Sequence, residues 1–365
     1  MKFKIVRSKF LEGLKKVQNI VGAKGSMLII QNVLIEAKEK ELILTTTDLD
    51  ISIRSHVPCE VTEEGSTTLP VKLLVNAIAK SPEGPIEVDV GAADCAFISA
   101  GSAEFKLNGM SVVDLPPLPE DQNSFEYVLP QMTLREMLRK TAYAASQDDT
   151  RKTLKGVLMS FRDGKLTMVA TDGRRLALVE HEVELPEDAQ KDIILPTKVV
   201  SELQRSLSGD GDARITIEKS QISFNLGETR LYSKLLDEVY PNYRQVIPGN
   251  CTERVVVDRQ LLLAALDRVS VMTMDESNSV CLTFDANQLI VASSKSSEAG
   301  SARDIVPIKY DGAKIDIVFN PSFVMDPLKA IDEDEVTIEL NNGTSPAMIK
   351  CSVPFLYVMM PLRIN

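Results

Sequence analysis

The stretch Thr171-Asp-Gly-Arg-Arg175 holds the residues with the clearest capacity for chemistry. Its carboxylate could take part in metal-dependent catalysis, and two consecutive arginines beside an apolar strand end call for a functional explanation. Alternating apolar residues run through Leu166–Ala170 and resume at Leu176. Asp-Gly between two such runs predicts a hairpin with a type I′ turn, in which both central residues have positive φ. We therefore expect these polar groups at the tip of a hairpin.

Few other residues could do chemistry. Asp148 and Asp149 are adjacent carboxylates that could hold Mg²⁺, whereas His56 and His181 fit structural or surface positions better than catalysis. The chain has no Gly-x-x-x-x-Gly-Lys-Ser/Thr, His-Glu-x-x-His or Gly-x-Ser-x-Gly pattern. We predict no catalytic residue, no metal and no cofactor. An enzyme that uses Asp148, Asp149 or Asp172 with a metal ion remains the alternative from another class.

The composition is that of a globular protein inside the cell. The 365 residues are 44% hydrophobic and contain no apolar run long enough to span a bilayer. The five cysteines are scattered and never form Cys-x-x-Cys, which favours reduced thiols over a disulfide framework or a zinc site. Charged residues interrupt the first apolar positions, so we predict no signal peptide and a cytoplasmic protein.

Three internal repeats organise the chain. The segment around Asp172 has a counterpart around Asp48, 124 residues earlier, and a weaker one around Ser294, 122 residues later. A second recurring element follows each of these, and a third closes each repeat. The second is centred on Pro70, Pro196 and Asn320, and the third on Pro116, Pro241 and Pro361. Since three elements recur in one order at one period, we predict three homologous domains over residues 1–122, 126–248 and 252–365.

Each repeat has the same predicted elements. A short strand opens it, at residues 3–6, 127–130 and 255–257. An amphipathic helix follows, then hairpin strands, a second helix after the Leu-Pro element and further alternating strands. The apolar stripes of the first helices comprise Phe10, Leu11, Leu14, Val17 and Gln18; Leu134, Met137, Leu138 and Thr141; and Leu261, Leu262, Ala265 and Val269. Pro70 and Pro196 suit the first turn of the second helices. The predicted fold is α+β, with two helices packed on antiparallel sheets in each domain.

Charge is distributed unevenly over these elements. The chain has a net charge of −11, but four predicted helices of the first two repeats have more basic than acidic residues. Their basic residues are Lys9, Lys15, Lys16, Lys72, Lys80, Arg135, Arg139, Lys140, Lys198 and Arg205. Lys and Arg without interleaved aromatic residues suit phosphate contacts rather than base stacking. We predict that these helices line a surface that binds nucleic acid without reading its sequence.

Taken together, these features resemble the bacterial DNA polymerase III beta subunits, the replication sliding clamps, over the whole chain. The resemblance is carried by Ala170-Thr-Asp-Gly-Arg-Arg-Leu-Ala177, Tyr240-Pro-Asn-Tyr-Arg244 and Tyr357-Val-Met-Met-Pro-Leu-Arg363. It implies a head-to-tail homodimer that forms a closed six-domain ring, with twelve helices around the hole. Such a ring encircles duplex DNA, is placed there by a clamp loader, and tethers the replicative polymerase alpha subunit and other proteins that carry a clamp-binding motif. It implies no enzymatic activity of its own.

The resemblance also assigns site residues. It implies a peptide-binding cleft formed by Leu154, Thr171, Gly173, Arg174, Arg175, Leu176, Pro241, Val246, Asn320, Phe323, Thr344, Val358, Met359, Met360, Pro361, Leu362 and Arg363. It implies DNA contacts at Lys24, Lys72, Arg151, Lys152 and Lys198, and a ring seam between Phe105 and Leu107 on one side and Val271 and Met272 on the other.

Three positions depart from the family pattern. Arg174 replaces a histidine of some members, Gln245 replaces an arginine at the cleft, and Asp148 stands where some members have glutamine. They affect peptide preference and DNA contact rather than the class. A specialised paralogue that binds DNA ends or confers drug resistance is therefore the alternative within the family. Only the middle repeat has Gly-Arg-Arg-Leu after its aspartate, which marks this hairpin as the docking site.

Overall fold

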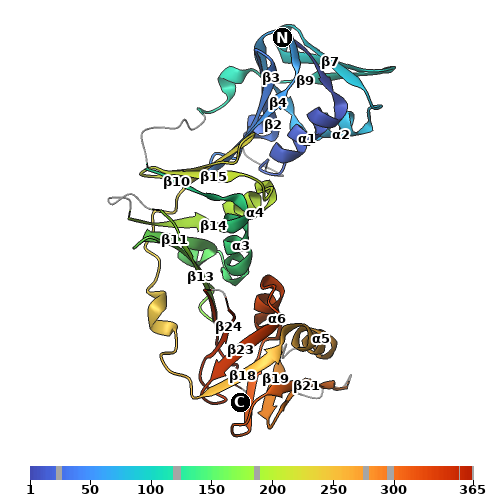
Figure 1. Ribbon diagram of the computed structural model, residues 1–365. Coiled ribbons are helices and arrows are strands. Elements are labelled where there is room, and N and C mark those ends of the chain that lie inside the picture. Colours follow the sequence, from blue (N-terminus) through green and yellow to red (C-terminus); the bar gives the residue numbers. More distant parts are fainter. Residues whose placement is uncertain are drawn as a thin grey trace. The chain divides into compact units, whose positions relative to one another are not determined.

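The computed structural model describes residues 1–21, 27–117, 125–184, 190–273, 279–293, 300–352 and 354–363 (Figure 1). Two compact units make up the chain, and each is described by itself. Unit 1 comprises Met1–Arg135 and Ser201–Leu235, and unit 2 comprises Glu136–Val200 and Leu236–Asn365. Among the described residues, no helix combines the length and the apolar character that crossing a membrane requires.

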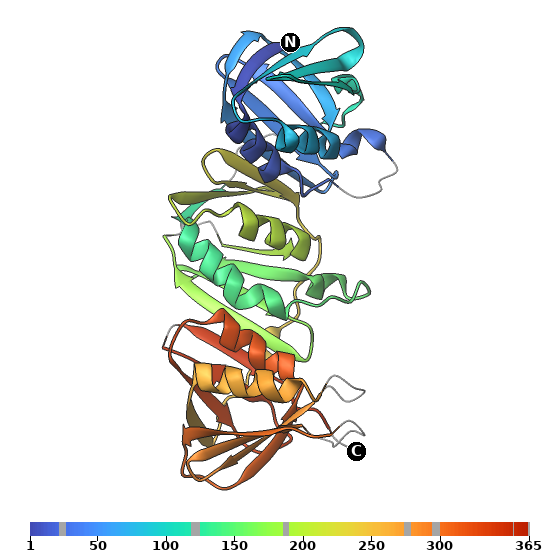
Figure 2. The same ribbon diagram turned by 90° about the vertical axis from the view of Figure 1, so that its right-hand side faces the viewer.

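Unit 1 contains two antiparallel sheets. The five-stranded sheet has the order β5-β1-β7-β8-β9, and the eight-stranded sheet has the order β10-β15-β16-β17-β4-β3-β2-β6. Helices α1 (Arg7–Val17) and α2 (Val71–Lys80) lie side by side in this unit (Figures 1 and 2). The strands are β1 (Lys2–Val6), β2 (Asn32–Lys38), β3 (Glu41–Thr47), β4 (Ile51–Pro58), β5 (Glu60–Glu63), β6 (Gly65–Pro70), β7 (Pro85–Val90), β8 (Cys95–Ala100), β9 (Ala103–Asn108), β10 (Phe125–Pro130), β15 (Asp212–Ile217), β16 (Gln221–Asn225) and β17 (Thr229–Lys234).

Unit 2 is built on one twelve-stranded sheet. Its order is β14-β11-β12-β13-β25-β24-β23-β18-β21-β20-β19-β22. Helices α5 (Arg259–Ser270) and α6 (Pro321–Ala330) lie side by side on it (Figure 2). Along the chain, the division between the units falls within α3 (Gln131–Thr141), after Arg135, and within α4 (Thr197–Ser206), after Val200. The strands are β11 (Gly156–Arg162), β12 (Lys165–Thr171), β13 (Arg175–Glu182), β14 (Lys191–Pro196), β18 (Glu253–Asp258), β19 (Val280–Asp285), β20 (Gln288–Ser293), β21 (Arg303–Lys309), β22 (Ile315–Phe319), β23 (Glu335–Leu340), β24 (Ala347–Lys350) and β25 (Phe355–Met359).

All six predicted helices form, with two corrections of detail. Leu261 is 48% exposed, so its place in the apolar stripe of α5 was predicted wrongly; Leu262, Ala265, Leu266 and Val269 form the buried face. The reason is the helical period, which turns residue 261 about 100° away from residue 262.

The prolines of the second helices also differ from expectation. Pro70 and Pro196 are the last residues of β6 and β14 rather than members of the first helical turn. Of the α-helices in the described part of the chain, only α6 starts with a proline, Pro321, directly after the N-cap residue Asn320. A strand end tolerates a proline because it has few backbone hydrogen bonds left to donate.

The hairpin at Asp172 forms, but its turn is not the predicted type I′. Among the described residues of this turn, only Gly173 has positive φ, at +86°. The Asp172 side chain fixes the turn instead, because its Oδ1 accepts hydrogen bonds from the backbone N–H groups of Arg174 (2.8 Å) and Arg175 (3.0 Å). Aspartate often closes turns in this way.

The first repeat has the same turn with different residues. Asp48 Oδ1 accepts hydrogen bonds from the backbone N–H groups of Asp50 (3.0 Å) and Ile51 (2.8 Å). Leu49 takes the place of Gly173 and has a φ of +80°. The repeat therefore specifies a backbone shape, which a leucine can adopt at a cost in strain.

Strand pairing crosses the predicted domain boundaries. In unit 1, β17 of the middle repeat pairs with β4 of the first, where Leu231 faces Ile53. In unit 2, β13 of the middle repeat pairs with β25 of the third, where Leu176 faces Val358. The large sheets therefore continue from one repeat into the next.

We predict that Gly173→Ala lowers the free energy of unfolding by about 1–2 kcal/mol, because an L side chain is strained at this φ. The cost is limited because Leu49 adopts the same conformation. Urea unfolding followed by circular dichroism measures it. Gly249→Ala is the control, since its added Cβ meets nothing within 4 Å and its φ carries no such strain. Equal stability of the two variants would contradict the prediction.

Candidate functional site

A groove of about 310 Å³ lies beside the Asp172 hairpin in unit 2. Three segments form it: the hairpin itself, the irregular chain after Tyr240, and the end of β25. Its lining residues are Leu154, Thr171, Gly173, Arg174, Arg175, Leu176, Pro241, Asn242, Tyr243, Val246, Val358 and Met360. Ten of these twelve belong to the predicted cleft.

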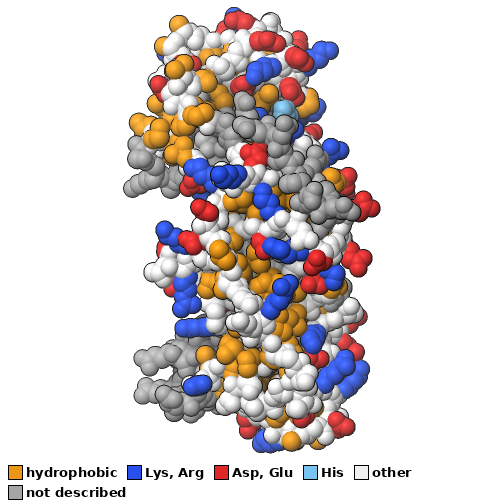
Figure 3. Space-filling model, turned by 90° about the vertical axis from the view of Figure 1, so that its left-hand side faces the viewer, with side chains coloured by type: hydrophobic (Ala, Val, Ile, Leu, Met, Phe, Trp, Pro, Cys, Tyr) orange, Lys and Arg blue, Asp and Glu red, His pale blue; other side chains and the backbone are white. Residues whose placement is uncertain are grey.

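The floor of the groove is part of a buried apolar cluster. Leu176 and Val358 pack with Leu158, Val169 and Met348 and are at most 5% exposed, as are all members of the cluster. Hydrophobic side chains gather on the sheet side of this unit, with Lys and Arg side chains around them (Figure 3). The groove thus combines a fixed apolar floor with charged surroundings, a combination typical of ligand sites.

The groove walls expose apolar side chains to solvent. Val246 is 52% exposed and Met360 is 42% exposed. Exposed apolar groups that line a concave surface indicate a binding site for an apolar ligand or peptide. Methionine is flexible and adapts to different partners.

Backbone bonds bring the distant segments together. Arg175 faces Met359 in the register of β13 and β25, and the N–H of Met360 donates to the carbonyl of Arg174 at 2.9 Å. The N–H of Leu362 donates to the carbonyl of Val318 at 2.8 Å, which fixes the chain beyond β25. The groove therefore has a wall made of main chain and not only of side chains.

The segment after Tyr240 covers the apolar cluster. Tyr240 and Tyr243 pack against the cluster, and a short 3₁₀ helix spans Tyr243–Val246. Burial raises the pKa of Tyr240 above its ordinary value. The guanidinium of Arg244 lies 5.5 Å from the centre of the Tyr243 ring. The tyrosines thus anchor this segment and leave Pro241 and Val246 at the groove.

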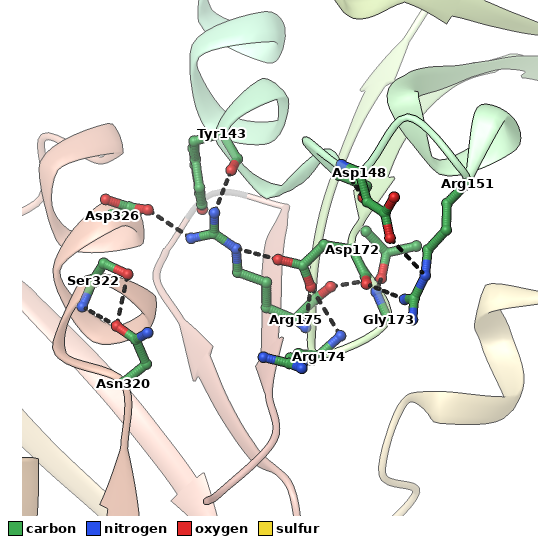
Figure 4. A network of polar contacts seen from close by, with 12 residues as sticks. Tyr143, Asp148, Arg151, Asp172, Gly173, Arg174, Arg175, Asn320, Ser322 and Asp326 are labelled. Carbon is green, nitrogen blue, oxygen red and sulfur yellow. Dashed lines mark hydrogen bonds and ion pairs between the residues drawn. The ribbon is translucent and has the colours of Figure 1, made fainter. Parts of the chain in front are cut away.

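Arg175 is the centre of a polar network behind the groove (Figure 4). Its Nε donates to Asp172 Oδ2 at 3.0 Å, its Nη1 to Asp326 Oδ2 at 2.6 Å, and its Nη2 to the carbonyl of Tyr143 at 2.6 Å. The guanidinium also lies 4.7 Å from the centre of the Phe323 ring. Only 12% of the side chain is exposed, so the guanidinium is engaged within the chain.

The surroundings of Arg175 keep it charged. Burial lowers the pKa of Arg175, but the hydrogen bond to Asp326 and the nearby carboxylates outweigh it and raise the pKa above its ordinary value. Burial raises the pKa of Tyr143 well above its ordinary value. The rings of Tyr143 and Tyr357 lie 5.9 Å apart beside the network. The arginine is therefore a fixed positive charge in a largely dry environment.

Arg151 contacts the hairpin from the other side. Its Nη1 donates to the carbonyl of Asp172 at 3.0 Å, and its Nε lies 3.7 Å from Asp148 Oδ2. Arg151 was predicted to contact DNA, and the structure places it next to the groove turn.

The two adjacent carboxylates that were considered as metal ligands have partners within the chain. Hydrogen bonds from Thr150 lower the pKa of Asp148, and Lys155 pairs with Asp149. No cluster of three or more metal-ligating side chains occurs among the residues that the structure describes.

Seven residues of the predicted cleft do not line the groove. Met359 is fully buried on β25, Phe323 stacks on Arg175, and Asn320 caps α6 by accepting from the N–H of Ser322 at 3.0 Å. Thr344 bonds to Asn342 in an exposed loop. Pro361, Leu362 and Arg363 follow β25 beyond the groove.

Sequence reasoning missed two lining residues, Asn242 and Tyr243. Both lie in the Tyr-Pro-Asn-Tyr-Arg run that carried the resemblance. A tyrosine two residues after a proline, in a segment with little regular structure, was the available signal. Its position over the apolar cluster could not be deduced from spacing.

The predicted DNA contacts lie on both units. Lys24 falls outside the described residues. Lys72 is exposed in the first turn of α2, Lys198 is exposed in the first turn of α4, and Lys152 is exposed on a 3₁₀ helix over Lys152–Lys155.

The predicted seam residues occupy accessible positions. Phe105 and Leu107 are half-buried on β9, which is an edge strand of the five-stranded sheet. Val271 is 63% exposed directly after α5, and Met272 beside it is half-buried. An edge strand has unpaired backbone groups that can pair with another chain.

Repeated α+β domains, continuous sheets and an apolar groove are features of a binding scaffold of the sliding-clamp type. Family models for the DNA polymerase III beta subunit match the N-terminal domain at residues 1–119, the central domain at 128–242 and the C-terminal domain at 244–363. The chain belongs to this family.

Relatives and solved structures agree with this assignment. The beta sliding clamps of Chlamydia trachomatis and Chlamydia muridarum are each 33% identical over all of this chain, covering 88% and 100% of those proteins. The sliding clamp of Bartonella birtlesii bound to griselimycin has a TM-score of 0.94 and 32% identity, with full coverage of both chains. That of Pseudomonas aeruginosa bound to griselimycin has a TM-score of 0.95 and 30% identity, also with full coverage.

We predict that Arg175→Ala lowers the free energy of unfolding by about 2–3 kcal/mol, because Asp172, Asp326 and the Tyr143 carbonyl lose a shared, largely buried donor. Urea unfolding measures the loss. Arg174→Ala is the matched control, since this neighbouring side chain is exposed and should change stability by less than about 0.5 kcal/mol. If both variants are equally stable, Arg175 does not hold the network together.

Proposed function

We propose that two copies of this chain close head to tail into a ring around duplex DNA and tether a polymerase there. The family supplies the general role, since sliding clamps are non-catalytic processivity factors of DNA polymerase III. The observation that carries the proposal is the groove at the β13–β25 junction, which offers an apolar floor and exposed apolar walls for a partner. Residues 1–122, 126–248 and 252–365 are proposed as the three clamp domains. A cytoplasmic location is proposed, because a protein with this role has to reach the DNA.

The groove suits a short linear peptide. Leu176 and Val358 can receive an aliphatic side chain, and Val246 and Met360 can close over it. Arg174 lies at the rim with an exposed guanidinium that can bind a carboxylate or a backbone carbonyl of the peptide. Such peptides would come from the polymerase alpha subunit, the clamp loader and other proteins with a clamp-binding motif. The remaining predicted cleft residues outside the groove are proposed as its support.

DNA is proposed to be held by its phosphates alone. Lys72, Lys152 and Lys198 are exposed cations on three different helical elements. Lysine contacts with phosphate are independent of sequence and weaken with salt. Lys24 and Arg151 are proposed to add to this set. Contacts of this kind keep a ring centred while it slides.

The ring is proposed to close through β9. Phe105 and Leu107 on this edge strand would meet Val271 and Met272 of the other copy. A head-to-tail contact uses two different surfaces and produces a closed ring when the rotation between copies is right. Because Val271 is highly exposed in the single chain, burying it against a second copy removes apolar surface from water.

Griselimycin, which is bound to the two solved clamps named above, is proposed to occupy this groove as well. We predict that Val246→Asp weakens griselimycin binding at least about tenfold, because a carboxylate in an apolar groove must lose its hydration. Isothermal titration calorimetry measures the affinity. Val239→Asp is the matched control: Val239 is 91% exposed in the same segment and does not line the groove, so its variant should bind like the unmodified protein. Equal weakening by both would show that the groove is not the site.

We predict that Val271→Asp converts a dimer into a monomer, because the seam cannot bury a charge without a partner. Light scattering after size exclusion measures the mass. Val113→Asp, at a position that is 90% exposed and outside the proposed seam, should stay dimeric.

The unmodified protein can also be tested for encirclement of DNA. After ATP-dependent loading, the unmodified ring should stay on a circular DNA through high salt and leave when the circle is cut. Retention on the cut DNA would indicate ordinary affinity. A stable monomer of the unmodified chain at micromolar concentration would overturn the ring.

A further inference from the structure

The two consecutive arginines of the hairpin have different surroundings. Arg174 is exposed at the groove rim, whereas Arg175 is 12% exposed. All three nitrogens of the Arg175 guanidinium group donate hydrogen bonds within the chain, and one of its faces stacks on Phe323. Each nitrogen of the Arg175 guanidinium group is therefore held by an acceptor within the chain.

The acceptors of Arg175 come from three separate elements (Figure 4). Asp172 belongs to the hairpin turn, Tyr143 to the 3₁₀ helix Ala142–Ala144 that follows α3, and Asp326 to α6. Asp172 has a double role, since its Oδ1 holds the turn while its Oδ2 holds Arg175. A continuous chain of hydrogen bonds thus runs from the groove wall to α6.

The first repeat acts as an internal comparison. Its turn has the same backbone bonds to Asp48, but the counterpart of Arg175 is Ile51, which is 3% exposed and apolar. The turn therefore forms without an arginine. Compared with the first repeat, the connection from Arg175 to a helix of the next repeat is an addition.

Helix α6 has reason to depend on that connection. Pro327 lies inside the helix directly after Asp326 and has no N–H to donate. A short helix that lacks an internal hydrogen bond relies on contacts with its neighbours. The ion pair between Asp326 and Arg175 is one such contact, with a distance of 2.6 Å.

We propose that Arg175 and Asp326 are positioning residues that couple the groove to α6. Asp326 does not line the groove, yet it fixes Arg175, which fixes Asp172 and with it the wall at Gly173 and Arg174. A wall held in place before binding lowers the ordering cost of binding. Coupling is reciprocal, so a ligand that fixes the wall also stabilises α6. This inference rests on the proposed peptide-binding role of the groove.

The test measures griselimycin affinity by isothermal titration calorimetry. We expect Asp326→Ala to raise the dissociation constant about 5- to 20-fold, at the lower end of the usual range of coupling between sites, and Asp326→Asn to raise it less. The matched control is Asp332→Ala, which removes the ion pair to Arg139 just after α6 and leaves the Arg175 network intact. Its affinity should stay within about twofold of the unmodified protein.

Two further measurements separate coupling from general destabilisation. In a double-mutant cycle, the effects of Arg175→Ala and Asp326→Ala on affinity should not add, whereas those of Arg174→Ala and Asp326→Ala should. Griselimycin should slow hydrogen exchange of the α6 amides in the unmodified protein but not in Asp326→Ala.

Each outcome has a defined meaning. If the unmodified protein fails to bind griselimycin, the proposed peptide-binding role of the groove is wrong, and the proposed coupling is wrong with it. If it binds and Asp326→Ala binds equally well, only the coupling is overturned. If Asp326→Ala does not fold, Asp326→Asn decides the question by the same affinity and exchange measurements, because it keeps the volume and an acceptor oxygen.

Discussion

The pairing of β13 with β25 is the interaction on which the groove depends. It places Leu176 opposite Val358 and Arg175 opposite Met359, although the members of each pair are separated by about half of the chain. Main-chain hydrogen bonds fix this register, and a shift of one residue would turn the apolar floor away from the groove. The strand pairing therefore fixes the position of the groove, and the side chains of Leu176 and Val358 line it.

Much of the fold could be predicted because it is local and repeated. The helix stripes and hairpin runs have clear periods, and one repeat supports the reading of the next. The turn type was wrong because the Asp172 side chain closes the turn in a way that the dipeptide alone does not reveal. The pairing of strands across repeats was not predictable, since no local pattern says which edges meet.

The site was predictable only through resemblance. Ten residues of the predicted cleft line the groove, but the same list included Met359, which is buried on β25, and Asn320, which caps α6. The role of Arg175 could not be read from its neighbours in sequence. Its partner Asp326 lies 151 residues away, and Ile51 shows that the repeat itself does not require an arginine. An ion pair between residues so far apart produces no repeating pattern in the sequence.

Continuous sheets have a consequence for how such a chain could have arisen and how it can be divided. The repeat is visible in sequence as a unit of about 120 residues, yet β17 and β13 of the middle repeat each give one edge to a neighbour. A middle repeat cut out alone would expose two bare strand edges, which invite aggregation. A repeat that arose by duplication would therefore need a neighbouring copy to cover each of these two edges.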